Sequence, residues 1–528
     1  MVTSAVTQIS AISSAARWRV PATSAAAGKR HRLLVMSNRT PSAAPERTRE
    51  VGGLVSVLDA ALRDEHGVWL GWSGQVHDEA RDLVIEGAEQ PVHARFDLPR
   101  AARERFYAGF CNSVLWPLFH GFASRVRGGD ADWDAYVAAN ERYARHALEL
   151  TQRDATIWVH DYHLLLTARM LRALGHRGPI GLFLHIPFPI RELVASVPWG
   201  RELVDAMLAF DLVGFQTDES ARNFVTAARM VPGTSCAVRA VQRGDHTTNV
   251  GVFPATICPE LFRAPVGDAG SAEADDRGGE APEIAGLRQT LGDRRLILSV
   301  DRLDYTKGIP ERLAAYEQML DQFPAWRRRV TFLQIAVPSR TDIRDYDELR
   351  RTVEGLVGRI NGRFGDIDWV PVRYLSRAYE RDLLARLYRL ADVALVTPLR
   401  DGMNLVAKEF VLAQDPARPG VLVLSPYAGA ADTLTSALFA NPFDPAGFAR
   451  AIDRALCEPL AERIERSRKL VASLEREGDA RSWARAFLDR LAQTREVPRG
   501  DVHSHSLHGT PDAARSGEPL VAVPDLAR

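Results

Sequence analysis

The chain has 528 residues, with 67 Lys or Arg balanced by 67 Asp or Glu, so its formal net charge is zero. Proteins that bind nucleic acid usually carry a basic excess, and this chain has none overall. Its hydrophobic fraction of 46% and charged fraction of 25% are ordinary for a globular protein, and its length predicts two or three domains.

The four cysteines form no C-x-x-C pair, which favours free thiols in a reducing compartment. No apolar run approaches the ~18–20 residues that span a bilayer. We therefore expect a cytoplasmic protein without a membrane partner. Residues 1–30 are rich in Ala and Ser and contain no acid, and residues 493–528 are rich in Gly, Pro, Ser and His. Both compositions predict disorder.

Short, continuous apolar runs recur along the chain, and helical stretches separate them. Apolar strands of this kind suit parallel sheets covered on both faces, and the intervening helices favour βαβ units. In chain order the predicted strands are Leu33–Met36, Thr156–Val159, Gly181–Leu184, Leu212–Phe215, Leu296–Val300, Val330–Ile335, Val393–Val396 and Val421–Leu424.

The alternation stops at residues 263–283, an acidic, glycine-rich stretch that predicts a flexible loop. We place the domain change near Val250. This gives an N-terminal domain of residues 31–249 and a C-terminal domain of residues 250–492, whose last helices could cross back onto the first domain.

Hydrogen-bonding and charged residues follow most of the predicted strands. Open parallel sheets bind ligands beyond the carboxyl ends of their strands, so this concentration predicts a cleft between two facing α/β domains. The groups concerned are Ser37–Arg39, Gly52-Gly53, His160–His163, His185–Pro189, Gln216-Thr217, Arg302–Gly308, Arg340 and Arg400–Glu409.

Several of these groups suit phosphate. Gly52 and Gly53 precede a helical stretch, where a backbone can approach a phosphate closely. Taken alone, a Gly-Gly pair is more simply an ordinary turn, and no GxGxxG fingerprint is present. Arg302 and Lys307 flank a turn and could neutralise a departing pyrophosphate, the other reading being a solvated surface pair.

The segment Arg400–Asn404 runs into a helix predicted over Leu405–Phe410, and the amides at that helix start could hold a second phosphate. Asp401 could accept hydrogen bonds from sugar hydroxyls, and Glu409 could accept them from ribose hydroxyls. Taken alone, Glu409 is more simply an exposed helical residue.

His160, His163 and His185 raise the question of a metal site. The first two follow a strand rather than forming an H-E-x-x-H helix, and no further cluster completes a ligand set, so we predict no metal. Tyr107, Trp116, Trp72 and Arg340 form a looser set. Their aromatic rings could stack on a sugar and the arginine could bind its phosphate, with core packing as the alternative for each tryptophan.

Nine segments together resemble, in order and spacing, the motif series of the trehalose-6-phosphate synthases. They are Ser37–Arg39, Val51–Leu54, Gly71–Gly74, Asn112–His120, His160–Leu164, His185–Pro189, Gly214–Thr217, Arg302–Arg312 and Pro398–Glu409. The resemblance extends roughly from Arg32 to Leu491. That family consists of retaining glycosyltransferases with the GT-B arrangement, two Rossmann-like parallel-sheet domains facing a central cleft.

The resemblance implies transfer of glucose from a nucleotide donor, usually UDP-glucose, to glucose 6-phosphate, giving α,α-trehalose 6-phosphate and the nucleoside diphosphate. It implies no cofactor, with the cations of Arg302 and Lys307 in place of a metal. It also implies a homo-oligomer, a dimer or tetramer.

By motif match, the acceptor would be bound by Arg39, Tyr107, Trp116, Asp161 and Arg340. The donor would be bound by Gly52, Gly53, Arg302, Lys307, Asp401, Gly402, Met403, Asn404, Leu405, Val406 and Glu409. Residues at the reaction centre would be Asp161, His185, Arg302, Lys307 and Asp401.

The sequence departs from the family after Phe253-Pro254, where the usual Ile-Gly-Ile is replaced by Ala255-Thr256-Ile257. Loss of the glycine puts the backbone of this interdomain loop in question. No phosphatase domain follows Leu491, so we expect the reaction to stop at the phosphorylated disaccharide.

Three alternatives stay open at this point. A sister enzyme would use glycerol 3-phosphate as acceptor and make glucosylglycerol phosphate. A catalytically silent sugar-phosphate sensor would keep the fold, although such proteins often lose the charged donor residues that are present here. A zinc hydrolase built on the histidines would lose activity to chelators. The donor base (uracil, adenine or guanine) is also undetermined.

Overall fold

The computed structural model describes residues 30–40, 58, 62, 67–79, 83–86, 92–263 and 281–494. Almost all of the predicted leader, tail and flexible loop therefore lies outside the described residues. Gly52 and Gly53 lie outside them as well. The last two residues of the predicted loop, Pro282 and Glu283, already belong to helix α10.

Two sheets organise the described chain, and every predicted strand is part of one of them. The first sheet has ten strands in the order β3-β4-β2-β1-β5-β6-β7-β10-β9-β8. Their bounds are β1 His31–Arg39, β2 Val68–His77, β3 Val84–Glu86, β4 Val92–Pro99, β5 Thr151–His160, β6 Ile180–Phe183, β7 Leu212–Phe215, β8 Thr234–Ala237, β9 Ala240–Arg243 and β10 His246–Val252.

The second sheet has six strands, all parallel, in the order β13-β12-β11-β14-β15-β16. Their bounds are β11 Arg295–Arg302, β12 Val330–Val337, β13 Val372–Leu375, β14 Val393–Val396, β15 Val421–Leu424 and β16 Leu438–Phe439. The first sheet is parallel at its centre, but β3, β9 and β8 join its edges antiparallel, which the apolar runs did not predict.

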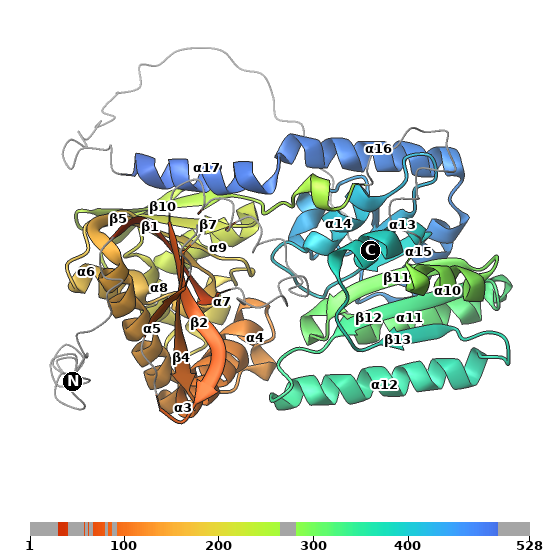
Figure 1. Cartoon of the computed structure of the whole chain (residues 1–528), viewed down its shortest axis with the longest axis horizontal. Coiled ribbons are helices and arrows are strands. Elements are labelled where there is room, and N and C mark those ends of the chain that lie inside the picture. The colour runs from red at the N-terminus through yellow and green to blue at the C-terminus, as the bar shows by residue number, and fades with distance from the viewer. Residues whose placement is uncertain are drawn as a thin grey trace, which may run out of the picture.

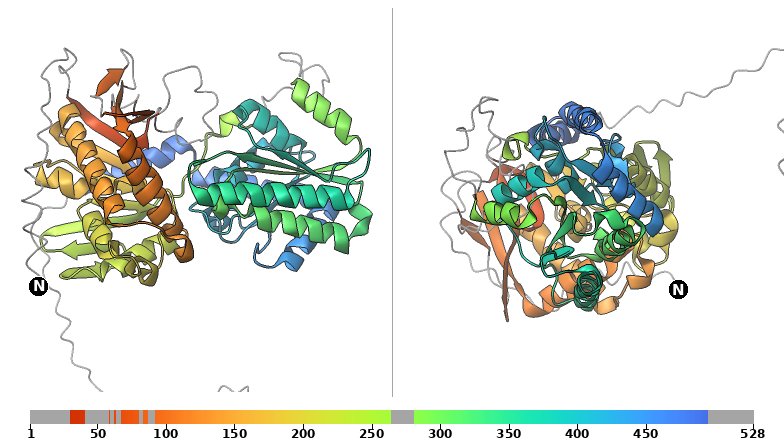
Figure 2. Two further views of the ribbon diagram at one scale, coloured as in Figure 1. Left: turned by 90° about the horizontal axis from the view of Figure 1, so that it is seen from below. Right: turned by 90° about the vertical axis from the view of Figure 1, so that its right-hand side faces the viewer.

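The central strands are continuous apolar runs because helices cover both of their faces, so every residue of β6, β7, β14 and β15 is buried. Figure 2 shows the two sheets as separate lobes, each with its own helices. The helices before β11 are α3 Arg100–Ala102, η3 Arg103–Leu115, α4 Trp116–Phe119, η4 Ala123–Arg125, α5 Asp130–Leu150, η5 Tyr162–Leu164, α6 Thr167–Ala173, α7 Arg191–Ala195, α8 Gly200–Met207, α9 Asp218–Ala228, η6 Pro259–Leu261 and α10 Pro282–Leu291.

The later helices are η7 Tyr305–Lys307, α11 Ile309–Gln322, η8 Pro324–Trp326, α12 Arg344–Phe364, α13 Arg381–Leu390, α14 Leu405–Ala413, η9 Gly429–Asp432, α15 Pro445–Cys457, α16 Leu460–Glu477 and α17 Ala480–Gln493. None of the helices in the described part of the chain combines the length and apolarity that crossing a membrane requires. Two facing parallel-sheet domains are the predicted GT-B fold class, which the architecture confirms (Figure 1).

The last two helices run along one side of both domains, as Figure 1 shows in blue. Helix α17 leaves the second domain and packs on the first sheet, where Phe487 stacks on Trp158 with ring centroids 4.8 Å apart. Gly181 and Gly214 make room for this ring, because a Cβ at either position would lie within 2.8 Å of Phe487. Trp483 also donates a hydrogen bond to the carbonyl of Phe253, at 3.0 Å.

Helix η3 is a π-helix of 13 residues that leads into Trp116. Its wide turns are closed partly by side chains, since Asn112 donates to the carbonyl of Tyr107 at 2.7 Å and Ser113 donates to that of Ala108 at 2.8 Å. π-Helical turns are rare and are frequent at functional sites. This one presents Tyr107 and Trp116 to the region between the domains.

Candidate active site

Several of the polar groups predicted to follow the strands lie between the two domains, whereas Gly52 and Gly53 are outside the described residues. Arg39 and His160 end β1 and β5, and Arg302 ends β11. Strands of a parallel sheet point their carboxyl ends to one edge, and here the two edges face each other. Contacts between the two sets of loops, described below, locate the site.

Backbone strain is concentrated at this place. Among the described residues, four that are not glycine have a positive φ, and three of them are predicted site residues: Asp161 at 72°, Arg340 at 52° and Asn404 at 80°. A left-handed backbone is unfavourable for residues with a Cβ and is retained where the surrounding structure imposes it, often at functional sites.

Asp161 and His185 lie side by side at the ends of β5 and β6. The Asp161 carboxylate accepts a hydrogen bond from the backbone amide of His185 at 3.2 Å. Burial raises the pKa of Asp161 to about 6, although that hydrogen bond and nearby arginines oppose the shift. Burial lowers the pKa of His185 to about 3, so its imidazole is neutral at pH 7.

The histidine cluster is a hydrogen-bonded and stacked group. His160 Nδ1 and His185 Nε2 share a hydrogen bond of 3.0 Å, while His163 stacks on the ring of Tyr107 at a centroid distance of 6.1 Å. Within the described ranges, no three His, Cys, Asp or Glu side chains are grouped so as to hold a metal ion.

Lys307 and Asp401 form a buried ion pair, with Nζ and Oδ2 2.5 Å apart, and Asn404 donates to the same oxygen at 3.0 Å. Burial alone would raise the pKa of the Asp401 carboxyl, but Lys307 and Asn404 outweigh it and hold the pKa below its ordinary value. The ion pair fixes the Lys307 side chain beside the loop that leads into helix α14.

The loop that carries Lys307 is supported from below by a fully buried arginine. Arg312 pairs with Asp301 at 2.7 Å and donates to the carbonyl of Lys307 at 3.0 Å. A buried guanidinium is costly unless it is hydrogen-bonded, and Arg312 also donates to Gln334, Ser299 and Thr397. This cluster fixes the turn between β11 and α11.

Gly402 brings the backbones of the two domains into contact. A Cβ added to this residue would lie 2.1 Å from the carbonyl oxygen of His185 in the other domain. Contacts under 3.0 Å force a rearrangement, so only glycine lets the loop before α14 approach the loop after β6 this closely.

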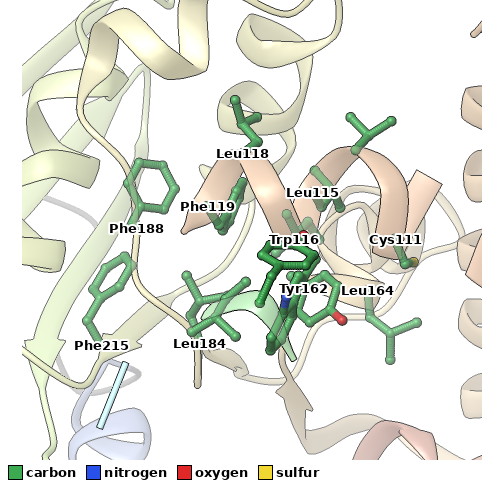
Figure 3. Packing of buried hydrophobic residues seen from close by; sticks show 14 of the residues in the cluster. Cys111, Leu115, Trp116, Leu118, Phe119, Tyr162, Leu164, Leu184, Phe188 and Phe215 are labelled. Carbon is green, nitrogen blue, oxygen red and sulfur yellow. The ribbon is translucent and has the colours of Figure 1, made fainter. Parts of the chain in front are cut away.

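The ring of Trp116 contacts two arginines. The guanidinium carbon of Arg340 is 3.8 Å from the centre of the Trp116 ring, and that of Arg302 is 5.4 Å from it. Figure 3 shows Trp116 beside Tyr162, and the two ring centroids are 5.7 Å apart. Trp116 thus joins the predicted donor-side cation Arg302 to the predicted acceptor-side cation Arg340.

The remaining acceptor candidates form a second aromatic group. Arg39 is exposed and its guanidinium carbon lies 5.4 Å from the ring centre of Trp72. Trp72 in turn meets Tyr107 edge to face at 5.7 Å. Arg39, Trp72 and Tyr107 are therefore contiguous, and Tyr107 reaches His163 through the stacking described above.

Glu409 is buried, so the simpler sequence reading of an exposed helical residue was wrong. Tyr388 donates to its carboxylate at 3.1 Å. Burial raises the pKa of Glu409 to about 7, and the tyrosine only partly offsets this. Met403 and Asn404 are likewise buried, whereas Leu405 and Val406 are partly exposed at the start of α14.

The interdomain loop, where Ala255-Thr256-Ile257 replaces the family's usual sequence, is fixed by hydrogen bonds at Ala255. Its amide donates to the side chain of Gln216 at 2.8 Å, and its carbonyl accepts from Lys408 Nζ at 2.7 Å. Thr256 stands in the place of the family's glycine, and its φ is not positive, so no glycine is required there. Lys408 is fully buried and also pairs with Glu477 at 2.6 Å, which ties the loop to the end of α16.

The structure adds residues that the sequence reading did not select. Asp304 contacts both Trp116 and Arg340, and Tyr162 accepts from Arg340 at 3.1 Å. His120 donates from Nδ1 to the carbonyl of Trp116 at 2.8 Å, which fixes its tautomer, and burial lowers its pKa to about 4. Asp304, Tyr162 and His120 all lie inside the motifs that resemble the family, and this was the sequence feature that could have identified them as site residues.

Fold and site together define a two-domain GT-B glycosyltransferase. The profile of glycosyltransferase family 20 matches residues 27–493, and the chain belongs to that family.

A trehalose-6-phosphate synthase of Enterobacter sp. (strain 638) is 40% identical over 464 residues, which cover 88% of this chain and 95% of the relative. Two solved structures are also similar. The UDP-forming α,α-trehalose-phosphate synthase of Burkholderia xenovorans in complex with glucose 6-phosphate is 41% identical, with a TM-score of 0.79 and coverage of 87% of this chain and 100% of that one. The Escherichia coli structure bound with UDP-2-fluoro glucose is 40% identical, with a TM-score of 0.80 and coverage of 87% and 99%.

Proposed function

We propose that the chain transfers glucose from UDP-glucose to the anomeric hydroxyl of glucose 6-phosphate, with retention, giving α,α-trehalose 6-phosphate and UDP. The observation that carries this is the contact of Trp116 with both Arg302 and Arg340. It brings a cation suited to a donor diphosphate and a cation suited to an acceptor phosphate next to the same ring. Relatives named for this reaction, about 40% identical over most of their length, support it.

On the donor side, we assign diphosphate binding to Arg302, Lys307 and the amides at the start of α14. Lys307 is held in an ion pair with Asp401, and the amides of a helix start favour phosphate. Glu409 would accept hydrogen bonds from ribose hydroxyls. The remaining proposed contacts are those of Gly52, Gly53, Gly402, Met403, Asn404, Leu405 and Val406.

On the acceptor side, we assign phosphate binding to Arg340 and Arg39, and sugar contacts to Tyr107, Trp116 and Asp161. Arg340 Nε is buried and has no partner in the protein, so a donor is left for a ligand. The proposed division of labour follows the two domains, with residues 31–249 holding most of the acceptor site and residues 250–492 most of the donor site.

In the transfer itself, the bond from the glucose anomeric carbon to the diphosphate oxygen breaks, and a bond to the acceptor hydroxyl oxygen forms on the same face. The hydroxyl proton passes to the leaving diphosphate. The protein stabilises the negative charge that develops on this group through Arg302 and Lys307 and positions the sugar through Asp401 and His185. A neutral His185 can take part in a hydrogen bond without adding charge to the site.

The test is nucleoside diphosphate release from UDP-, ADP- and GDP-glucose, with and without glucose 6-phosphate, in EDTA. We expect release from UDP-glucose that requires the acceptor and is insensitive to the chelator. Equal or faster release with glycerol 3-phosphate would overturn the acceptor assignment. Binding of both ligands without any release would indicate a sensor, and loss of activity in EDTA would indicate a metal.

We also propose that the protein acts in the cytoplasm as a dimer or tetramer. All four cysteines carry free thiols, which suits a reducing compartment. Light scattering of the purified chain would give the assembly state, and a monomer at all concentrations would contradict this part of the proposal.

A further inference from the structure

Asp304 is a fully buried carboxylate at the start of the turn η7, between Arg302 and Lys307. Its Oδ1 caps that turn by accepting hydrogen bonds from the amide and the hydroxyl of Thr306, both at 3.0 Å. A buried carboxylate is costly unless every lone pair finds a donor. Thr306 supplies two of these donors locally, and the other donors come from residues distant in sequence.

The second group of partners joins Asp304 to the acceptor candidates. Arg340 Nη1 and the Tyr346 hydroxyl both donate to Oδ2 at 3.3 Å, and Trp116 Nε1 donates to Oδ1 at 3.4 Å. Burial would raise the pKa of Asp304, but Arg340 and Arg302 outweigh it and keep the pKa below its ordinary value. The carboxylate is therefore ionised at neutral pH.

Arg340 is oriented by what surrounds it. Its Nη1 contacts Asp304 and Tyr346, its Nη2 donates to Tyr162, and its plane faces the Trp116 ring. The side chain is 5% exposed and its Nε has no protein partner. The Arg340 guanidinium is thus held through both terminal nitrogens and its face, and the Nε donor remains for an anion.

Trp116 belongs to the first domain, whereas Asp304 and Arg340 belong to the second. The contact among the three exists only in the relative domain position seen here. Moving the domains apart would remove the Trp116 ring from Arg340 and one hydrogen bond from Asp304.

We propose that Asp304 is a positioning residue that orients Arg340 for the acceptor phosphate and makes this orientation depend on closure of the domains through Trp116. The inference rests on the proposed function. Asp304 would not touch the substrate but would act through Arg340 and Trp116.

The experiment measures KM for glucose 6-phosphate, kcat, and the dissociation constant of UDP for the full chain and its variants. For Asp304→Asn we expect KM for glucose 6-phosphate to rise at least about tenfold, since one charge-assisted hydrogen bond is lost, while UDP binding changes less than about twofold. For Tyr346→Phe, which removes a single hydroxyl, we expect KM for glucose 6-phosphate to rise about three- to tenfold.

Asp347→Asn is the matched control, because Asp347 neighbours Tyr346 on α12 but pairs only with the surface residues Arg350 and Arg351. It should leave all three constants unchanged. A double-mutant cycle of Asp304→Asn with Trp116→Phe tests the link between the domains. We expect the combined rise in KM to be smaller than the product of the single effects.

An unchanged KM in Asp304→Asn, or single effects that simply multiply, would overturn the proposal. If Asp304→Asn does not fold, Tyr346→Phe decides, and an unchanged KM in that variant overturns it. Failure of the proposed function is seen separately, because the wild-type chain itself would then release no UDP in response to glucose 6-phosphate.

Discussion

At the scale of single residues, burial sets the chemistry of the site. Asp161 and Glu409 have raised pKa values, whereas Asp401 and Asp304, equally enclosed, have lowered ones. The difference is a cation in direct contact, because Lys307 pairs with Asp401 and Arg340 pairs with Asp304, and each favours the charged form more than burial disfavours it. Carboxylates next to the phosphate-binding cations are thus kept ionised.

Glu409 gives a pH prediction. Its pKa of about 7 means that its proton must leave before the carboxylate can accept from ribose hydroxyls. We expect UDP-glucose affinity to rise as pH increases from about 6 to 8, and Glu409→Gln to give a weaker affinity that does not vary with pH. Calorimetric titration with UDP-glucose, which has no group that titrates in this range, measures it.

Raising the pH has the opposite effect on the contribution of Glu409 to folding stability. Because the folded pKa of Glu409 lies above its ordinary value, the folded state holds this proton more tightly, and the contribution to stability declines as pH rises from about 4.5 to 7. A UDP-glucose affinity that falls with rising pH in the wild type would contradict the assigned role.

At the scale of elements, the loop before α14 depends on one glycine. Gly402→Ala would place a methyl carbon against the His185 carbonyl, so the two loops must separate. We expect kcat/KM for UDP-glucose to fall about a hundredfold, since small displacements of catalytic groups are costly. Gly358→Ala, on the exposed face of α12 where nothing lies within 4 Å, is the control and should keep full activity.

Helix α17 gives a prediction about stability. Phe487 fills the space above Gly181 and Gly214, so Phe487→Ala leaves a cavity. We expect the free energy of unfolding to fall by about 3–5 kcal/mol in urea titrations, provided that unfolding is cooperative. The exposed Asp489→Ala on the same helix should change it by less than about 0.5 kcal/mol. A small effect for Phe487→Ala would mean that α17 is not firmly docked.

At the scale of the whole molecule, ion pairs connect the two domains around the cleft. Arg125 and Asp345 are 3.0 Å apart, Arg400 and Glu219 are 2.9 Å apart, and Arg103 pairs with Asp342. All are partly exposed, so each contributes no more than ~1 kcal/mol, and salt screens them. Together they favour the closed arrangement in which Trp116 meets Arg340.

Neutralising two of these bridges tests that idea. For the double variant Glu219→Gln and Asp345→Asn, we expect KM for glucose 6-phosphate to rise about two- to fivefold at low ionic strength. Raising the salt concentration should raise the KM of the wild type towards that of the variant, because screening weakens the same ion pairs. Glu465→Gln, on the surface of α16, is the control. If the ratio of the variant KM to the wild-type KM does not change with salt concentration, these ion pairs have no role in closure.

The sequence by itself indicated the GT-B class and the central strands of both sheets, whereas β2, β4, β10, β13 and β16 were not among the predicted strands. Apolar runs and the polar groups after them are local patterns, and motifs such as those around Arg302 and Asp401 extend over only about a dozen residues. The antiparallel edges were not predicted, since short half-exposed strands such as β8 and β9 leave no continuous apolar run.

Only the tertiary structure decided what each polar residue does. The burial of Glu409 depends on Tyr388, from another helix, and the backbone of Ala255 is held by Lys408, which is 153 positions away. Asp304 likewise acquires its partners from Trp116 and Arg340. Charge state and orientation depend on neighbours brought together by folding, and a single sequence does not specify which distant residues those are.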